Sequence, residues 1–258
     1  MKKSLSLSLL LTSMASLPAM AHVDYTGQDL GTFTGLSAAT GSVLDTSVGG
    51  NYGWADAADA DWGNSHKGRF LKFTLENPAD VTLSMQSTTM EPNSSGGVLL
   101  PGFSVYEGLA PLGAHDFTDL AFLWRDMQAG PAADEGYWNA LGSFQAANEA
   151  GETAFLTFQG YAVDGTAANF GSPTTQPGVT GDGVADGMVS KSFSLDAGTY
   201  SVVVGGATYD AAGTAAGNRN YHFNADIAVA AIPEPETYAM LLAGLGLIGA
   251  IARRRKSA

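Results

Sequence analysis

Two groups of aspartates, set among Gly and Ala residues, have the composition of metal-binding loops. The first group is Asp56, Asp59 and Asp61, and the second is Asp164, Asp182 and Asp186. Calcium takes several oxygen ligands from carboxylates and backbone carbonyls, and loops of this kind supply both. Neither group has the alternating D-x-D-x-D-G spacing of an EF-hand loop. The sequence therefore leaves two interpretations of each group, a calcium site or solvated turns.

The histidines of the chain, and the absence of common catalytic motifs from its sequence, give little support to an enzymatic function. His115 precedes Asp116, and a histidine oriented by a carboxylate can act as a base, although a turn histidine bonded to the backbone is the alternative. The chain contains no H-E-x-x-H, G-x-S-x-G or G-x-x-x-x-G-K motif. We therefore expect no enzymatic activity and assign no catalytic residue. A secreted hydrolase that uses a pair of carboxylates is the alternative.

Aromatic residues lie close to the first aspartate group. Trp54 and Trp62 flank it on either side. An exposed Trp or Tyr ring can stack on the apolar face of a sugar while its polar atom stays hydrated. Trp54 and Trp62 are therefore candidate ligand-binding residues, and packing in the core is the alternative.

The composition excludes several classes of protein. Of the 258 residues, 45% are hydrophobic and 14% are charged, which is enough apolar material to bury a core. The chain has no cysteine, which excludes disulfides, thiolate zinc sites and cysteine nucleophiles. The formal net charge is −13, whereas a nucleic-acid partner requires a basic face. We therefore expect no nucleic-acid partner.

The first 21 residues have the order of a secretory signal peptide. Lys2 and Lys3 form a short basic start, and an uncharged apolar stretch follows. Ala19 and Ala21 then supply small residues at positions −3 and −1 of a cleavage site. We predict that the secretion machinery exports the chain and that residues 1–21 are removed, so that the mature protein begins at His22.

The last residues form a second terminal signal. An apolar run over residues 238–252 is followed by Arg253, Arg254 and Arg255. As a helix with a rise of about 1.5 Å per residue, the run reaches roughly 22 Å, less than the ~30 Å hydrocarbon core of a bilayer. The basic cluster predicts that this end stays on the cytoplasmic side, which leaves the body outside the inner membrane.

This tail resembles the PEP-CTERM sorting signal of Gram-negative bacteria. The resemblance covers residues 233–258 and rests on Pro233, Glu234 and Pro235, the short apolar segment and the arginine cluster. It implies an exosortase as partner, a transient anchor in the inner membrane, and release to the cell surface or the extracellular matrix. An ordinary C-terminal anchor is the alternative.

Residues 22–232 form the body between these two signals. The signals contain six of the 12 basic residues and two of the 25 acidic ones, so the body has a net charge of −17. Apolar and polar residues alternate over 70–75 and 81–86, and again over 193–195 and 200–204. Asn77-Pro78 joins the first two runs and Asp196-Ala197-Gly198 joins the second two, which predicts two hairpins. Further strands are predicted at 103–106, 154–158 and 223–229.

Short strands separated by Gly- and Asp-containing turns predict an all-β, single-domain body of the sandwich or jelly-roll type. Two short helical insertions are expected, one starting at Asp116 and one carrying Tyr137, Leu141 and Phe144 at spacings of four and three. The stretches FTLENPADVTLSM and LDAGTYSVVV resemble secreted β-sandwich modules of the bacterial pre-peptidase C-terminal type. That resemblance implies an accessory or binding role rather than catalysis.

The terminal signals and the acidic β-rich body together predict a secreted protein of the cell surface or extracellular matrix. We expect a non-enzymatic structural or binding role linked to exopolysaccharide or biofilm. Tryptophans beside acidic loops are the sequence feature that favours a polysaccharide ligand.

Overall fold

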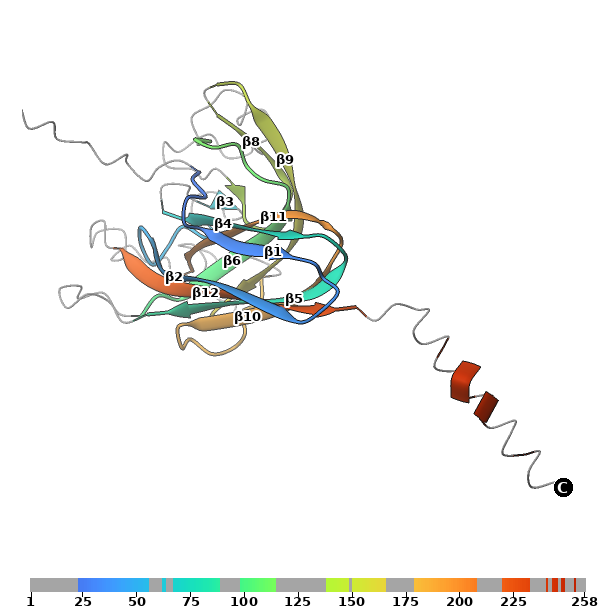
Figure 1. Ribbon diagram of the computed structural model, residues 1–258. Helices are drawn as coiled ribbons and strands as arrows, with labels where there is room; N and C mark the ends of the chain where they lie inside the picture. Colours follow the sequence, from blue (N-terminus) through green and yellow to red (C-terminus); the bar gives the residue numbers. More distant parts are fainter. Residues whose placement is uncertain are drawn as a thin grey trace, which may run out of the picture.

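The computed structural model describes residues 23–55, 62–63, 67–88, 98–114, 138–148, 150–165, 179–207 and 220–232, with residues 240, 243–245, 247–248 and 253 of the tail. Two β-sheets face each other as a sandwich (Figure 1). The predicted all-β sandwich class is therefore confirmed. The signal peptide with Ala19 and Ala21, and the helix expected at Asp116, lie outside the described residues.

The sandwich has a six-stranded sheet and a four-stranded sheet. The larger sheet has the order β1 (Asp29–Phe33), β4 (Arg69–Leu75), β11 (Gly198–Gly206), β6 (Pro101–Glu107), β9 (Thr153–Val163) and β8 (Phe144–Ala147). The smaller sheet has the order β10 (Met188–Leu195), β5 (Ala79–Ser87), β12 (Tyr221–Ala231) and β2 (Ala39–Val48). A short pair joins β3 (Trp62–Gly63) to β7 (Trp138–Asn139). Neighbouring strands are antiparallel except β1 and β4, which are parallel.

The predicted strands exist, but the prediction that they pair as two hairpins is wrong. β4 belongs to the six-stranded sheet and β5 to the four-stranded sheet, so the turn at Asn77-Pro78 crosses the sandwich. The turn at Asp196 crosses it again between β10 and β11. β4 pairs with β11 and β5 pairs with β10 instead. Each of the two turns therefore joins one sheet to the other.

The main core fills the space between the sheets. Alternate residues of β4 and β5 point into this space, and Leu71, Phe73 and Leu83 among them are 0% exposed. The rings of Phe73 and Tyr200 stack with centroids 5.0 Å apart. Burying one large apolar side chain contributes about 1.5–3 kcal/mol, so these inward residues account for most of the favourable free energy of this core.

A second core covers the outer face of the six-stranded sheet. Trp54 and Trp138 pack there against outward-facing Phe70 and Tyr106, and all four side chains are buried. Trp54 Nε1 donates to Ser104 Oγ at 3.0 Å, and Ser104 Oγ donates to the Ala140 carbonyl at 2.7 Å. The central strands β11 and β6 are therefore buried on both faces, as in sheets covered by another layer.

Two glycines allow the segment that carries Asn51 and Trp54 to approach the six-stranded sheet closely. A Cβ on Gly102 would lie 2.6 Å from the indole ring of Trp54. A Cβ on Gly206 would overlap the backbone of Asn51, where the segment preceding Trp54 crosses β11. Only glycine leaves room for this approach.

The helix expected over Tyr137, Leu141 and Phe144 is wrong. The described residues there form strands β7 and β8, and none of the described residues from 23 to 232 is helical. Phe144 pairs with Leu156 of β9, so hydrogen bonds to a neighbouring strand replace those of a helix. Phe144 lies in the second core and Leu141 packs against it, so burial in this core explains why these positions are apolar although the segment is not a helix.

Candidate functional site

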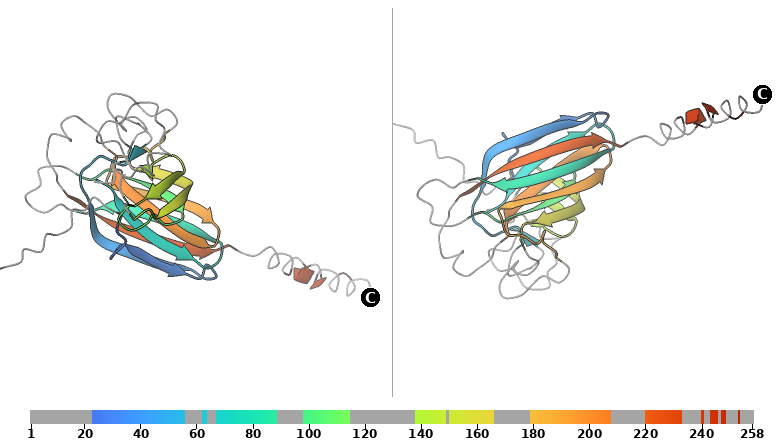
Figure 2. Two further views of the ribbon diagram at one scale, coloured as in Figure 1. Left: turned by 90° about the horizontal axis from the view of Figure 1, so that it is seen from above. Right: turned by 90° about the horizontal axis from the view of Figure 1, so that it is seen from below.

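The outer face of the four-stranded sheet carries an array of hydroxyl groups, and Figure 2 (right) shows the four strands side by side. Its side chains are polar because the apolar residues of these strands point inward and the polar ones outward. We call this surface the hydroxyl face, and it consists of Thr40, Ser42, Thr82, Ser84, Ser190, Ser192 and Ser194 with the carboxylates of Asp80 and Asp226.

Hydrogen bonds between β5 and β10 order this array. They join Thr82 Oγ1 to Ser192 Oγ at 2.7 Å, Ser84 Oγ to Ser190 Oγ at 2.8 Å, and Ser194 Oγ as donor to Asp80 Oδ1 at 2.6 Å. Ser190 Oγ also donates to the Leu83 carbonyl at 3.2 Å. A hydroxyl has one donor, so Ser84 donates to Ser190 and the pair keeps only lone pairs for other partners. The face therefore offers more acceptors than donors.

A shallow groove of about 280 Å³ lies on the hydroxyl face between β2, β12 and β5. It is lined by Thr40, Gly41, Ser42, Thr82, Ser84, Asp226, Ile227 and Ala228. Asp226 is the only charged residue in this lining, and its side chain is exposed. The groove thus combines hydroxyls with one carboxylate.

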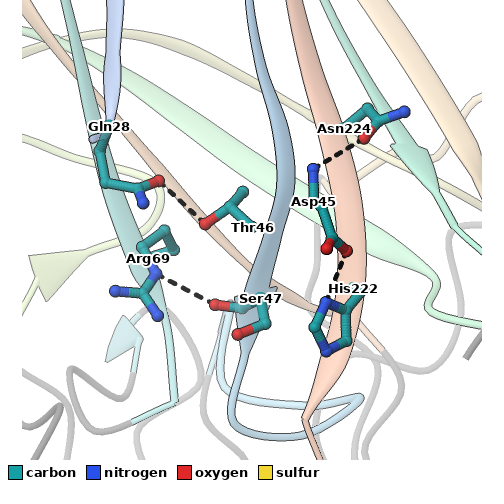
Figure 3. A network of polar contacts seen from close by, with 7 residues as sticks. All are labelled: Gln28, Asp45, Thr46, Ser47, Arg69, His222 and Asn224. Atoms are coloured by element: carbon teal, nitrogen blue, oxygen red, sulfur yellow. Dashed lines mark hydrogen bonds and ion pairs between the residues drawn. The ribbon is translucent and has the colours of Figure 1, made fainter. Parts of the chain in front are cut away.

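A polar network holds β2 against its neighbours at the end of the same sheet (Figure 3). Asp45 has a φ of 53°, and the register of β12 with β2 shifts between Phe223 and Ala225. The Asn224 side chain accepts the Asp45 N–H at 2.9 Å, and His222 Nδ1 lies 2.8 Å from Asp45 Oδ1. These two contacts hold the irregular strand in place.

The same network connects β2 to the other sheet. Thr46 Oγ1 donates to Gln28 Oε1 at 2.9 Å, and Arg69 Nε donates to the Ser47 carbonyl at 3.0 Å. Arg69 belongs to β4 and Gln28 immediately precedes β1, so these bonds close one side of the sandwich. This network is structural support for the sheet that carries the hydroxyl face.

The second aspartate group is brought together, and its carboxylates accept backbone N–H groups. Asp164 accepts from Asp186 at 3.1 Å and from Gly187 at 2.7 Å. Asp182 Oδ1 accepts from Gly165 and Val184, and Asp186 Oδ1 accepts from Met188. Burial, more than the nearby Asp182 and Asp186, raises the pKa of Asp164 to about 6. In the described part of the chain, no three acidic or histidine side chains converge as metal ligands.

Of the other predicted site residues, Trp54 and the backbone of Trp62 are described by the structure. Trp54 is 0% exposed and its indole is hydrogen-bonded, so it packs in the second core and is not available for stacking on a ligand. The backbone of Trp62 pairs with Asn139 in β3. Outside the described residues lie Asp56, Asp59, Asp61 and His115.

The hydroxyl face was not among the predicted sites, although the sequence carries a signal for it. Ser190, Ser192 and Ser194 recur at every second position around a buried strand residue, Phe193. Such a pattern indicates one face of a sheet with uniform small polar side chains. The groove itself depends on which strands are neighbours, which the pattern does not contain.

A second hollow, of about 400 Å³, lies beside the N-terminal segment. It is lined by Asp24, Tyr25, Thr26, Lys72, Leu109, Ala110 and Leu112. The N–H and the side chain of Thr26 hold the pKa of Asp24 below its ordinary value. Among the described residues, the linings of this hollow and of the groove each contain a single carboxylate.

The sorting tail follows the last strand directly. β12 ends at Ala231, and Pro233, Glu234, Pro235, Arg254 and Arg255 lie outside the described residues, whereas Arg253 is helical and exposed. Four described apolar residues of the tail, Met240, Leu245, Leu247 and Ile248, are 57–75% exposed. Over the described residues, no helix is both long enough and apolar enough to cross a bilayer.

Comparison with known proteins identifies the tail. The PEP-CTERM protein-sorting motif matches residues 231–256, which confirms the predicted sorting signal and implies processing by an exosortase. No curated protein matches the chain.

Two solved structures of secreted or surface proteins are similar to this chain. CorA of Methylomicrobium album BG8, a surface-associated copper-binding protein, is 17% identical over 79% of this chain and 98% of its own, with a TM-score of 0.47. MopE of Methylococcus capsulatus, a secreted protein in which an oxidized tryptophan facilitates copper binding, is 16% identical over 83% of this chain and 92% of its own, with a TM-score of 0.42. Both similarities are remote.

Proposed function

We propose that the body of this exosortase-sorted surface protein is a non-enzymatic module of the extracellular matrix that binds a neutral polysaccharide through its hydroxyl face. The observation that carries the proposal is the acceptor-rich groove between β2, β12 and β5, with Asp226 in its lining. The tail accounts for sorting, and the groove accounts for binding after release.

The chemistry of the groove suits a sugar chain. Each sugar hydroxyl has a donor to offer, and the Ser84–Ser190 pair and Asp226 present free lone pairs. Hydrogen bonds to a carboxylate are roughly twice as strong as neutral ones, so Asp226 orients the chain most strongly.

The charge of the surface selects among polysaccharides. Asp80 and Asp226 are the charged groups of the hydroxyl face, and the body as a whole has a net charge of −17. A polymer of uronic acids or sulfated sugars is repelled by this surface. A neutral polysaccharide is therefore the proposed ligand.

The alternative of a secreted hydrolase has less support. A glycosidase of the common type needs two carboxyl groups about 5–10 Å apart across the scissile bond. The groove contains only Asp226, and the second hollow contains only Asp24 beside Lys72. A binding role uses the groove as it is, without a second acid.

Before processing, we propose that the apolar run 238–252 holds the body at the outer face of the inner membrane. The tail is then removed and the body reaches the cell surface or matrix. Deletion of residues 233–258 is expected to abolish both processing and surface location, which fractionation of cells with and without the exosortase measures.

The polysaccharide proposal is tested with a variant that fills the groove. Ala228→Arg places a long side chain in the lining without removing a hydrogen bond, and we expect the affinity for neutral matrix polysaccharide purified from the host to fall at least about ten-fold, or about 1.4 kcal/mol. Thr157→Arg on β9 of the other sheet is the matched control and should bind as the wild type does. Equal binding by both variants would show that the groove is not the binding site.

A further inference from the structure

Strand β10 is an edge of the four-stranded sheet. It pairs with β5 on one side, and the sheet order places no described strand on its other side. β9 of the facing sheet borders the same side of the sandwich, and β8 pairs with β9 only over residues 153–156. The N–H and C=O groups of an edge strand are a template for pairing with another chain. This side of the sandwich is therefore the place where a second copy of the protein would add a strand to the sheet.

A lysine occupies a core position of this edge strand. Lys191 pairs with Leu83 of β5, and residues paired across antiparallel strands point to the same face of the sheet. Leu83 is buried, and so are Val189 and Phe193, which precede and follow Lys191 by two positions in β10. The backbone therefore directs the Lys191 side chain to the face of the sheet on which its neighbours are apolar and form the main core.

The Lys191 side chain reaches from this position to β9 and stays exposed. Its Nζ donates to the Tyr161 carbonyl at 2.8 Å. The same atom lies 5.2 Å from the ring centroid of Tyr161 and 5.7 Å from that of Phe193, within the range of cation–π attraction. These three contacts hold a positive charge across the side of the sandwich, between β10 and β9.

We propose that Lys191 blocks the pairing of β10 with β10 of a second copy of the protein. Two identical strands pair in antiparallel fashion about a two-fold axis. Pairing over nearly all eight residues, with the two core faces aligned, places Lys191 opposite Lys191 or Phe193 of the second copy. Two ammonium groups would then lose water without a carboxylate partner and repel each other, so the pairing is unfavourable.

The first test replaces Lys191 in the protein purified after export and follows association by sedimentation. Lys191→Val removes the charge and supplies a β-branched residue in the core register, and we expect the association constant to rise at least about a hundred-fold. Lys72→Val is the matched control, because Lys72 lies on β4, which is paired with β1 and β11 on its two sides. Association of Lys191→Val no stronger than that of the wild type, or equal association of both variants, would overturn the proposal.

Two further variants separate the block from a loss of stability. Lys191→Glu removes the bond to the Tyr161 carbonyl but keeps a charge at the edge, so it should associate no more than the wild type. Association as strong as that of Lys191→Val would show that the lost bond is the cause, contrary to the proposal. Lys191→Thr, which is β-branched but polar, replaces Lys191→Val if the latter precipitates. We expect it to associate at least about ten-fold more strongly than the wild type, and a monomer at all concentrations would contradict the block.

Hydrogen exchange locates the contact in the associated variant. Amides within residues 188–195 should exchange more slowly at concentrations where Lys191→Val associates than where it is dissociated, whereas those of β2 at the opposite edge of the sheet should be unchanged. Slowing in β2 instead, or no slowing in β10, would show that association uses another surface and refute the assignment. The result does not depend on the proposed ligand, because the groove lining contains no residue of β10.

Discussion

The buried carboxylate of Asp164 makes the stability of the protein depend on pH in a direction opposite to that of an ordinary ion-paired aspartate. Its residue is 2% exposed, and burial raises its pKa from the ordinary value of 3.8 to about 6, against the effect of two N–H donors. The folded state therefore binds a proton that the unfolded state lacks between about pH 4 and pH 6. The substitution Asp164→Asn removes the carboxyl group and with it this uptake of a proton.

The sign and size of this pH dependence follow from the linkage between proton binding and folding. The free energy of unfolding decreases with rising pH wherever the folded state binds more protons, and the loss levels off above about pH 7. For one group with these two pKa values, the change between pH 5.0 and pH 7.5 is about 1.4 kcal/mol. Solvent at the surrounding turns screens the charge, so we expect about 1 kcal/mol.

Urea unfolding of the purified wild type and the Asp164→Asn variant at pH 5.0 and pH 7.5 measures this effect. The difference in unfolding free energy, wild type minus variant, is expected to be about 1 kcal/mol smaller at pH 7.5 than at pH 5.0. Asp226→Asn, which removes an exposed carboxylate, controls for the loss of one negative charge. An unchanged difference at the two pH values would refute the assigned titration of Asp164.

Two other predictions concern the second core. Ser104→Ala removes the buried hydrogen bonds to Trp54 Nε1 and to the Ala140 carbonyl, and should cost about 2–4 kcal/mol in thermal or urea unfolding. Exposed Ser192→Ala should cost less than about 1 kcal/mol, and equal costs would contradict the network. Gly206→Ala places a Cβ against the Asn51 backbone and should cost about 3 kcal/mol or more, whereas Gly244→Ala in the tail should leave unfolding unchanged; a stable Gly206→Ala variant would contradict the close approach.

Strand positions could be predicted from the sequence, but strand pairing could not. Leu75 and Val81 are inward-facing in a hairpin and also when the turn crosses to the facing sheet. Alternation of apolar and polar residues is the same in both arrangements, because it reports only that one face is buried. The choice between them depends on β10 and β11, more than 100 residues further along the chain.

Burial of β11 on both faces is visible in the sequence as a run of residues in which apolar and polar positions do not alternate. Tyr200, Ser201, Val202, Val203 and Val204 are all at most 1% exposed, and this nearly continuous apolar run is typical of a strand covered on both sides. The residues that cover it include Trp54 and Trp138. From the sequence alone, a tryptophan beside a polar loop can be either a core residue or a ligand contact. Only the fold distinguishes these two roles.

The place of the candidate site could not be predicted from the sequence. The acidic and aromatic loops were the predicted binding residues, whereas the groove is formed by three strands that are far apart in sequence. Asp226 and Ser84 become neighbours only through the pairing of β12 with β5. A local pattern cannot contain that information, because register is set by the whole sheet.

The position of the last two strands determines when the protein can fold during export. β12 lies between β5 and β2, and β11 lies between β4 and β6, so both sheets lack a central strand until the final third of the chain has crossed the membrane. Contacts between residues so far apart in sequence form slowly, and the incomplete sheets expose unpaired strand edges. For a chain exported from its N-terminus, as we predict from residues 1–21, we therefore expect folding to be completed only after β12 has crossed the membrane.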